Sequence, residues 1–488
     1  MSPELQKQVA GLGPGTSDQL AAHLSRSVAG VAEWMATYGP YESHPASAVP
    51  EDALCRAQEA LVDKLKNNYP FFHPRYVGQM LKPPHPAAVV GYATAMLVNP
   101  NNHALDGGPA TAQLEKEVVA KLAAMFGYPD FLGHLTSSGT IANLEALFVS
   151  REIHPEKGIA HSADAHYTHG RMSHILGMES HAVATDSRGR MDLDDLERLL
   201  RTGQIGTVVM TAGTTGLGAI DPIDRAVPLC ARYGVRIHVD AAYGGFFKLI
   251  ADDSADGVAK APFEAIADCD SVVVDPHKHG LQPYGCGAVL FRDPSVQAFY
   301  RHDSPYTYFT SEDLHLGEIS IECSRSGASA AALWMTLEVL PLTNDGLGQL
   351  LRAGRRATLA WAQKIRESEV LELFQEPELD ILSYFARSRS LSEIDLASGH
   401  VLDAGMNAPP DKAVFVATYN VTPDAFAARS HDVDAELGTA RILRSVVMKP
   451  ETELIVDQLH AAVEDLVDDA LMVSRGFPDS RLDHETRT

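Results

Sequence analysis

The stretch SVVVDPHKHGLQPYGCGAVLF, residues 271–291, joins two apolar runs through a polar hexapeptide. The runs, 271–274 and 287–291, have the length and composition of buried strands. The hexapeptide, 275–280, places Lys278 between two histidines at the end of the first run. Asp, Pro, Gly and Lys are common in turns, so one interpretation is a plain polar connection between two strands. The other is a chemical role for the lysine, which requires support from the rest of the chain.

The size and composition of the chain are those of a globular protein with more than one domain. Its 488 residues exceed what one hydrophobic core normally serves, which predicts two or three domains. Hydrophobic residues make up 45% and charged residues 21%, an ordinary balance. The five cysteines are scattered, and none stands in a CxxC pair. Neither a disulfide framework nor a metal site is therefore predicted, and a cytoplasmic location is expected.

The charge of the chain disfavours two classes of partner. A formal net charge of −24 repels phosphate backbones and anionic lipids, so neither nucleic acid nor a membrane surface is expected as a partner. No apolar run approaches the roughly 20 residues needed to cross a bilayer. The first 20 residues have neither a basic nor an apolar signal region, so no secretory signal is predicted.

Changes in sequence texture divide the chain into three predicted parts. Residues 1–86 contain helical patterns followed by an irregular, Pro- and His-rich stretch, YPFFHPRYVGQMLKPPHP, which is expected to wrap around another surface. Residues 87–335 alternate between strand-like and helical patterns and form the predicted large domain. Residues 336–488 combine long helices with a few strand-like pieces, such as KAVFVATYNV and ILRSVVM, which predicts a smaller α+β domain.

The large domain is expected to contain a mainly parallel sheet. The segment TAQLEKEVVAKLAAMFGYP predicts a helix, because its apolar residues recur on one stripe and Gly127 follows as a stop. Short β-rich runs stand between such helices: TVVMTAG, VRIHVDAA, SVVVD and GAVLF. Continuous apolar strands separated by helices favour an α/β fold whose sheet is covered on both faces.

Polar residues follow the predicted strands at their carboxyl ends, where ligands bind in open parallel sheets. They are Thr214 and Thr215, Asp240, and the pair His277 and Lys278. Upstream, the sequence SSGT, residues 137–140, directly precedes a predicted helix. Backbone N–H groups at a helix start attract anions, so this turn is a candidate phosphate cradle, although SSGT is also an ordinary helix cap.

These features together match the requirements of pyridoxal 5'-phosphate (PLP). A lysine can form a Schiff base with the cofactor aldehyde, a carboxylate can keep the pyridine nitrogen protonated, and a cradle can hold the phosphate. Asp240 precedes Lys278 by enough residues for one helix and one strand. Each feature has an ordinary structural explanation, but their joint occurrence at successive strand ends favours the cofactor.

The sequence resembles the group II PLP-dependent amino acid decarboxylases. The resemblance rests on HPRYVGQM, TSSGTIANLEAL, ADAHYTHGR, AGTTGLGAIDPI, HVDAAYGG, DPHKHG and SRSGASAAALW, in this order over roughly residues 70–340. The form DPHK followed by GAVLFRD is most similar to the tyrosine/aspartate branch. The resemblance implies fold type I, the aspartate-aminotransferase type, and a homodimer with active sites at the interface.

The resemblance implies catalytic roles for three residues. Lys278 would carry the cofactor, and Asp240 would pair with the pyridinium nitrogen. His166 would stack on the ring face opposite the substrate. Without the resemblance, His166 would be taken as one loop histidine in a histidine-rich stretch.

The remaining cofactor contacts follow from the same resemblance. Ser138, Gly139 and Thr140 would hold the phosphate, with help from His277. Thr214 would lie near the polar edge of the ring.

Residues for the substrate are implied or suggested outside these motifs. The resemblance implies that Arg444, in ILRSVVM, grips the α-carboxylate of the substrate, and that a loop tyrosine protonates Cα. Tyr306 and Tyr308 both stand near the expected spacing, and the sequence does not choose between them. Tyr76 would suit an aromatic substrate, whereas His103 could bind a phenol or a side-chain carboxylate.

The predicted activity is decarboxylation of an L-amino acid to its amine and CO2, with an aromatic, tyrosine-like substrate favoured. The first alternative is an acidic substrate, aspartate or glutamate. An aminotransferase and a carbon–carbon lyase of the same fold are further alternatives. Aminotransferases usually place an aromatic ring where this chain has the histidine of HYTHG, and the similar lyases are anchored in membranes.

Overall fold

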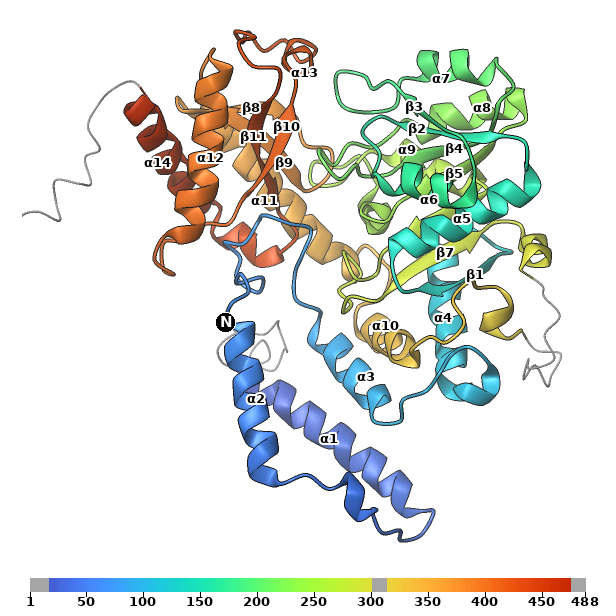
Figure 1. Ribbon diagram of the computed structural model, residues 1–488. Helices are drawn as coiled ribbons and strands as arrows, with labels where there is room; N and C mark the ends of the chain where they lie inside the picture. Colours follow the sequence, from blue (N-terminus) through green and yellow to red (C-terminus); the bar gives the residue numbers. More distant parts are fainter. Residues whose placement is uncertain (1–16, 301–313, 475–488) are drawn as a thin grey trace, which may run out of the picture.

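The computed structural model describes residues 17–300 and 314–474, which form two sheets with helices around them (Figure 1). The larger sheet has seven strands in the order β1-β7-β6-β5-β4-β2-β3. Their bounds are β1 Leu132–Thr136, β2 Gly158–Ser162, β3 Ser180–Val183, β4 Ile205–Thr211, β5 Arg236–Asp240, β6 Ser271–Val274 and β7 Gly287–Phe291.

Strand directions in this sheet confirm the predicted, mainly parallel arrangement. Neighbours from β3 through β2, β4 and β5 to β6 are parallel, while β7 runs antiparallel to both β6 and β1. Every residue of β4, β6 and β7 is buried, as expected for strands covered on both faces. The carboxyl ends of β4, β5 and β6 therefore meet at one edge of the sheet.

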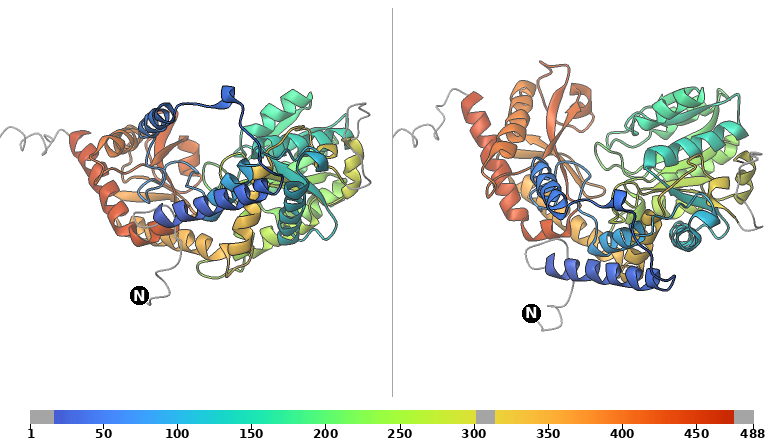
Figure 2. Two further views of the ribbon diagram at one scale, coloured as in Figure 1. Left: turned by 90° about the horizontal axis from the view of Figure 1, so that it is seen from below. Right: turned by 60° about the horizontal axis from the view of Figure 1, so that its bottom comes forward.

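Helices of the larger domain cover the two faces of this sheet (Figures 1 and 2). Helix α4 ends where Gly127 adopts a positive φ of 85°, a left-handed conformation that favours glycine. Asp192 caps α7, because its carboxylate accepts from two backbone N–H groups of the first turn. The bounds are α4 Pro109–Phe126, α5 Gly139–Ile153, α6 Thr168–Leu176, α7 Leu193–Leu200, α8 Ile223–Tyr233, α9 Lys260–Glu264 and α10 Gly327–Val339.

The second sheet is smaller and fully antiparallel, in the order β10-β11-β9-β8. Trp361 and Tyr384 are among the large side chains buried in its core, between the sheet and its helices. The strands are β8 Leu371–Gln375, β9 Ile381–Ala386, β10 Ala417–Val421 and β11 Ala440–Val446. The helices are α11 Leu347–Glu367, α12 Leu391–Asn407, α13 Pro423–Ala427 and α14 Val456–Ser474.

Three helices precede the large sheet: α1 Ser17–Ala36, α2 Glu51–Leu65 and α3 Pro86–Met96. No residue of α1 or α2 is buried, and both helices lie outside the two sheets (Figures 1 and 2). Helix α3 packs on α10, and α1 packs on α3, where the Thr94 hydroxyl lies 2.7 Å from that of Ser27. The described residues also form short 3-10 helices: Pro45–Ser47, Leu105–Gly107, Gly245–Ile250, Ala265–Asp268, Pro294–Phe299, Leu316–Glu318 and Pro450–Leu454.

The irregular stretch before α3 lies along the small sheet. Val77 N–H donates to the carbonyl of Phe415, and Val446 N–H donates to the carbonyl of Val77. Lys449 Nζ donates to the carbonyl of Tyr76 from a buried position. The stretch thus joins the small domain, while the division of the chain at residues 87 and 335 stays a prediction. Within the described parts of the chain, no helix is both long and apolar enough to cross a membrane.

Candidate active site

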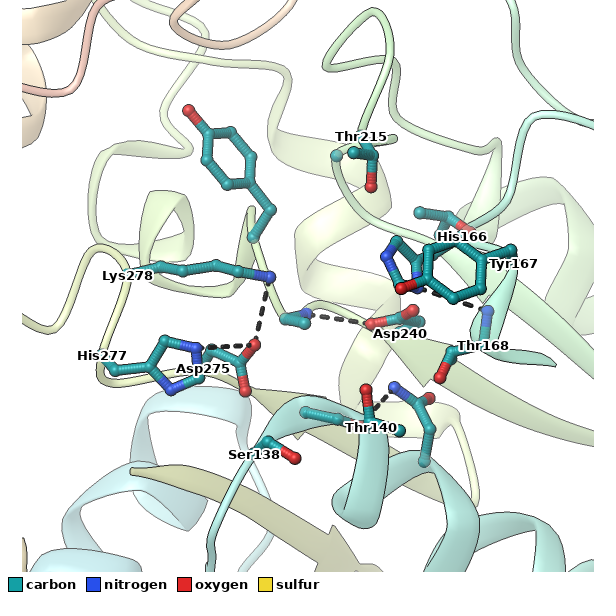
Figure 3. Close-up of a pocket in the computed structure, with 16 residues that line it drawn as sticks. Ser138, Thr140, His166, Tyr167, Thr168, Thr215, Asp240, Asp275, His277 and Lys278 are labelled. Carbon is teal, nitrogen blue, oxygen red and sulfur yellow. Dashed lines mark hydrogen bonds and ion pairs between the residues drawn. The ribbon is translucent and has the colours of Figure 1, made fainter. Parts of the chain in front are cut away.

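A polar cavity of about 260 Å³ opens where the carboxyl ends of β4, β5 and β6 meet the start of α5 (Figure 3). Lys278, Asp240 and Asp275 point toward the same space in this view. The lining residues are Ser138, Gly139, Thr140, Asn143, His166, Tyr167, Thr168, Thr211, Gly213, Thr215, Asp240, Ala242, Tyr243, Asp275, His277 and Lys278.

Asp240, the last residue of β5, is a buried carboxylate at the floor of this cavity. Its Oδ2 lies 2.9 Å from Nε2 of His169, and its Oδ1 accepts from the N–H of Ala242 at 3.1 Å. Burial opposes its ionisation, but the hydrogen bond and charge of His169, together with the charge of Lys278, hold the pKa of Asp240 well below its usual range. Asp240 is therefore a fixed negative charge.

Lys278 follows β6, and its amine points into the cavity (Figure 3). Its Nζ lies 3.0 Å from Oδ2 of Asp275, the residue that begins the DPHK sequence. Nδ1 of His277 donates to the carbonyl of Cys286 at 2.7 Å, which fixes the ring on the cavity wall. Burial lowers the pKa of His277, so the ring is held as neutral imidazole.

The start of α5 forms a small cradle beside Lys278. Ser138 caps the helix, because its Oγ accepts from the N–H of Ile141. The first N–H groups of a helix have no partner inside it and carry partial positive charge. Gly139 is required here, since a Cβ on this residue would lie 2.6 Å from Oδ2 of Asp275. The cradle therefore presents backbone donors and has no room for a larger side chain.

His166 lies on another wall of the cavity, next to Tyr167 (Figure 3). The two rings are 4.2 Å apart between centroids, and the His166 Nδ1 accepts from the N–H of Thr168 at 3.3 Å. Burial lowers the pKa of His166, with Asp240 offsetting part of the shift, so the ring is neutral and can stack on a ligand.

Of the two threonines that follow β4, Thr215 lines the cavity and Thr214 does not. Thr214 is fully buried, and its Oγ1 accepts from the N–H of Ala219 at 3.1 Å. Thr215 lines the cavity instead (Figure 3). The structure thus favours Thr215 over Thr214 for a contact with the cofactor ring.

Arg444 lies in β11, beside this site but not on the cavity wall. Its guanidinium donates to the carbonyls of Thr215 at 2.6 Å, Gly216 at 3.0 Å and Gly78 at 3.3 Å. It is 5% exposed. Burial lowers the pKa of Arg444, which nonetheless remains a cation in proteins. Arg444 ties the strand end of the large sheet to the stretch around Gly78.

The other predicted substrate residues do not line the cavity in this chain. Tyr76 packs among Phe71 and Phe415, and its hydroxyl accepts from the N–H of Gln79. His103 lies near Gly317, whose N–H donates to its carbonyl. The candidate loop tyrosines, 306 and 308, lie outside the described residues.

Several residues of the site are absent from the sequence-based prediction, and three of them contact its charged groups or form its wall. Asp275 and Tyr243 line the cavity, and His169 holds Asp240 from behind. The DPHK sequence contained a signal for Asp275, since its carboxylate stands three residues before the lysine. His169 comes from α6 and Tyr243 follows β5, so their positions depend on packing and turn geometry, which sequence patterns do not specify.

The residues present fit PLP. Three cavity-lining residues have buried oxygen atoms with no hydrogen-bond partner among the described residues: Asp275 Oδ1, Thr211 Oγ1 and Thr168 Oγ1. Buried polar atoms normally have partners, so the cavity is suited to a polar ligand. An amine, a fixed carboxylate and a helix start that suits a phosphate surround one space, which matches the aldehyde, pyridine nitrogen and phosphate of PLP.

Comparisons with known proteins agree with this fit. Residues 70–387 match the family model described as the pyridoxal-dependent decarboxylase conserved domain. A probable L-tyrosine/L-aspartate decarboxylase of Methanothermobacter thermautotrophicus is 30% identical over 314 residues, 64% of this chain and 82% of the relative. The L-tyrosine decarboxylase of Enterococcus faecium is 30% identical over 391 residues, 60% of this chain and 63% of the relative.

The fold is also that of solved structures. The crystal structure of Oryza sativa TDC with PLP and tryptamine matches with a TM-score of 0.74 and 16% identity. The match covers 94% of this chain and 99% of that chain. This likeness confirms the expected fold type I.

Fold and site thus define a PLP-dependent enzyme of fold type I. The chain belongs to the pyridoxal-dependent decarboxylase family and is a PLP-dependent amino acid decarboxylase, as the motifs predict. The aminotransferase and carbon–carbon lyase alternatives are set aside on this result.

Proposed function

We propose that this enzyme decarboxylates an aromatic, tyrosine-like L-amino acid to the corresponding amine and CO2. The observation that carries the proposal is the placement of Lys278 and Asp240 on one cavity, at the ends of neighbouring parallel strands. The bound cofactor supplies an electron sink at the substrate Cα. The protein must then hold the cofactor, orient the substrate and keep water from the bond that breaks.

Lys278 and Asp240 would hold the two ends of the cofactor ring system. The Lys278 amine would hold the cofactor through its aldehyde group. The Asp240 carboxylate would keep a proton on the pyridine nitrogen. Its fixed negative charge, held by His169 and Ala242, suits a cation at that position.

The start of α5 and the rings of His277 and His166 would hold the rest of the cofactor. Ser138, Gly139 and Thr140 provide the helix start that binds the phosphate, with His277 beside it. The His166 ring, on the cavity wall, would stack on a face of the cofactor.

Arg444 is proposed to bind the α-carboxylate of the substrate. Its three hydrogen-bond partners are neutral carbonyls, and no carboxylate of the described chain forms an ion pair with it. A buried cation whose hydrogen-bond partners are all neutral favours an anion next to it. Holding the carboxylate at one place would orient the substrate so that the bond from Cα to the carboxylate carbon is the one that breaks.

A loop tyrosine, Tyr306 or Tyr308, is proposed to protonate Cα after CO2 leaves. Tyrosine is a suitable acid, because its hydroxyl can donate a proton. Exchanging each for phenylalanine separates the two candidates.

Two observations favour an aromatic over an acidic substrate. The basic side chains that line the cavity, among the described residues, are His166, His277 and Lys278, all assigned to the cofactor. Arg75, the arginine of HPRYVGQM, carries a charge that could pair with an acidic side chain, but it donates to the carbonyls of Pro410 and Asp411. An acidic substrate remains the alternative, because the Methanothermobacter relative is described for both tyrosine and aspartate.

We further propose a homodimer that works in the cytoplasm. Helices α1 and α2 have no buried residues, and they expose large apolar side chains. About half of the surface is exposed for each of Trp34, Leu54, Leu61 and Leu65. Isolated helices gain most of their stability from packing an apolar face, which a second copy of the chain could provide. All five cysteines are free thiols, which suits a reducing compartment.

The experiment is a substrate screen with the purified protein and PLP. Amine and CO2 are measured for tyrosine, phenylalanine, tryptophan, aspartate and glutamate, with Lys278→Ala as the inactive control. The proposal requires amine and CO2 in equal amounts and the highest kcat/KM for an aromatic substrate. A kcat/KM for either acid tenfold above the best aromatic would move the assignment to the acidic class. Arg75→Gln should affect both classes alike, since its partners are backbone carbonyls.

A further inference from the structure

Asp380 is a buried carboxylate of the small domain that contacts a residue of the cavity wall. It directly precedes β9 and is 1% exposed. Burial raises the pKa of Asp380 to about 6, although the hydrogen bond from Tyr243 and the charge of Lys82 oppose the shift. A buried carboxylate is costly unless it is well paired, so its partners show what it does.

The first partner of Asp380 is a residue of the cavity wall. The Tyr243 hydroxyl donates to Oδ1 of Asp380 at 2.5 Å, across 137 residues of sequence. Tyr243 is 3% exposed and lines the cavity three residues after Asp240. A short hydrogen bond to a carboxylate fixes a phenol strongly. The position of Tyr243 therefore depends on a residue of the other domain.

The second neighbour of Asp380 directly follows the cofactor lysine. Nε2 of His279 lies 3.3 Å from Oδ2 of Asp380, which is an ion-pair distance without the geometry of a hydrogen bond. The His279 ring meets Tyr243 and Phe247 edge-on, with centroids 4.8 Å and 4.9 Å apart. Burial lowers the pKa of His279, so the ring packs as neutral imidazole. Tyr243, His279 and Asp380 form one packed group behind Lys278.

Two cationic side chains, Lys82 and Arg355, lie near the carboxylate of Asp380. Lys82 donates to the carbonyl of Met448, and Arg355 donates to the carbonyls of Pro377 and Leu379. These hydrogen-bond partners are neutral. Among the charged groups near Lys82 and near Arg355, Asp380 has the largest effect on the pKa of each, after burial. The carboxylate of Asp380, just before β9, is thus close enough to act on cations of the stretch before α3 and of helix α11.

The geometry points to Asp380 as a positioning residue of the cofactor site, which fixes the Tyr243 hydroxyl and, through Tyr243, the ring of His279 beside Lys278. The small domain thereby sets the shape of the wall next to the cofactor lysine. This inference rests on the proposed function only in that it takes the cavity as the PLP site. It does not depend on the identity of the amino acid substrate.

The test is a PLP titration of the apoprotein, followed by the absorbance of the bound cofactor. Asp380→Ala removes the acceptor of the Tyr243 hydroxyl and should weaken PLP binding by about tenfold to a hundredfold. Asp380→Asn keeps an amide oxygen that accepts the same hydrogen bond and should bind PLP within about threefold of the unchanged protein. Rescue by asparagine separates positioning of the hydroxyl from a need for the charge.

A double-mutant cycle shows whether Asp380 acts through Tyr243. Tyr243→Phe should weaken PLP binding as Asp380→Ala does, and the double variant should be no weaker than the worse single variant. Tyr384→Phe is the matched control: Tyr384 is also buried, and its hydroxyl bonds Ser445, but it does not line the cavity. It should leave PLP binding unchanged.

Three results would overturn the inference: additive losses in the double variant, no rescue by asparagine, or a Tyr243→Phe variant that binds PLP like Tyr384→Phe. The last comparison holds even if Asp380→Ala does not fold, because both phenylalanine variants keep the packing volume. A failure of the proposed function would look different. The unchanged protein would then bind PLP and respond to the Asp380 substitutions as described, yet release no amine from aromatic amino acids.

Discussion

Nε2 of His169 lies 2.9 Å from Oδ2 of Asp240, and both side chains are buried. His169 is in the first turn of α6, and Asp240 ends β5, 71 residues later. A carboxylate oxygen only accepts, so Nε2 of His169 is the donor of this hydrogen bond. The pair gives Asp240 one orientation and a stabilised negative charge, and this charge is what the cofactor nitrogen requires.

Replacing His169 with alanine should lower kcat more than it raises KM. A hydrogen bond to a charged group contributes about 1.5–3 kcal/mol, which corresponds to roughly a ten- to hundredfold loss of rate. Steady-state kinetics on the best substrate measure the effect. His174 is exposed on the same helix, and His174→Ala serves as the control that should stay within twofold of the unchanged enzyme. Equal rates for both variants would mean that His169 does not support Asp240.

Asp240→Asn should still bind PLP but lose most of the rate. The amide has no charge to keep a proton on the pyridine nitrogen, and losing one partner of a buried ion pair costs several kcal/mol, hence roughly a thousandfold or more in kcat. PLP titration and steady-state kinetics are the two measurements. A variant within tenfold of the unchanged enzyme would show that another group supplies the charge.

The two substitutions of His166 should behave differently. His166→Phe retains a ring at the cavity wall and should keep much of the PLP affinity. His166→Ala should bind PLP more weakly, because ring stacking contributes about 0.5–1.5 kcal/mol beyond area burial. PLP titrations compare the two variants directly. If both bind PLP equally well, ring stacking is not the function of this residue.

Acid should destabilise the protein through His238. This side chain is fully buried between Ser271 and Asn143, and burial lowers its pKa to about 3. Between pH 6.5 and 3 the unfolded chain binds a proton at this histidine that the folded chain does not. The free energy of unfolding therefore falls as pH drops, by up to about 1.4 kcal/mol per pH unit from this group.

Urea unfolding at pH 7 and pH 5 measures that slope. His238→Gln keeps a donor and an acceptor but cannot titrate, so the slope should be shallower than in the unchanged protein. The exposed His174 provides the control, because His174→Gln removes a side chain that stays in water in both states. A slope that is the same in all three proteins would show that His238 does not contribute.

The sequence predicted the large sheet well because its strands are buried on both faces. Strands β4, β5, β6 and β7 fall within the runs TVVMTAG, VRIHVDAA, SVVVD and GAVLF or overlap them closely. Continuous apolar runs leave few alternatives to a covered, parallel sheet. The convergence of Asp240 and Lys278 then follows, because parallel neighbours end at the same edge.

Local turn geometry and long-range packing explain what the sequence could not predict. The chain turns after β4 so that Thr215, not Thr214, faces the cavity, and no spacing rule distinguishes adjacent residues in a loop. The partners of Tyr243 and Asp240 come from 137 and 71 residues away. Tyr76 was expected to line the pocket, but the aromatic cluster with Phe71 and Phe415 holds it against the small domain.

The most direct test of the account is reductive trapping of the cofactor. Borohydride reduction of the purified protein with PLP fixes the cofactor to the lysine that holds it, and peptide mapping by mass spectrometry identifies that lysine. The account predicts the label on Lys278 alone, and its loss in a folded Lys278→Ala variant. A label on any other lysine, in either protein, or no label in the unchanged protein, would contradict the assignment of this cavity as the cofactor site.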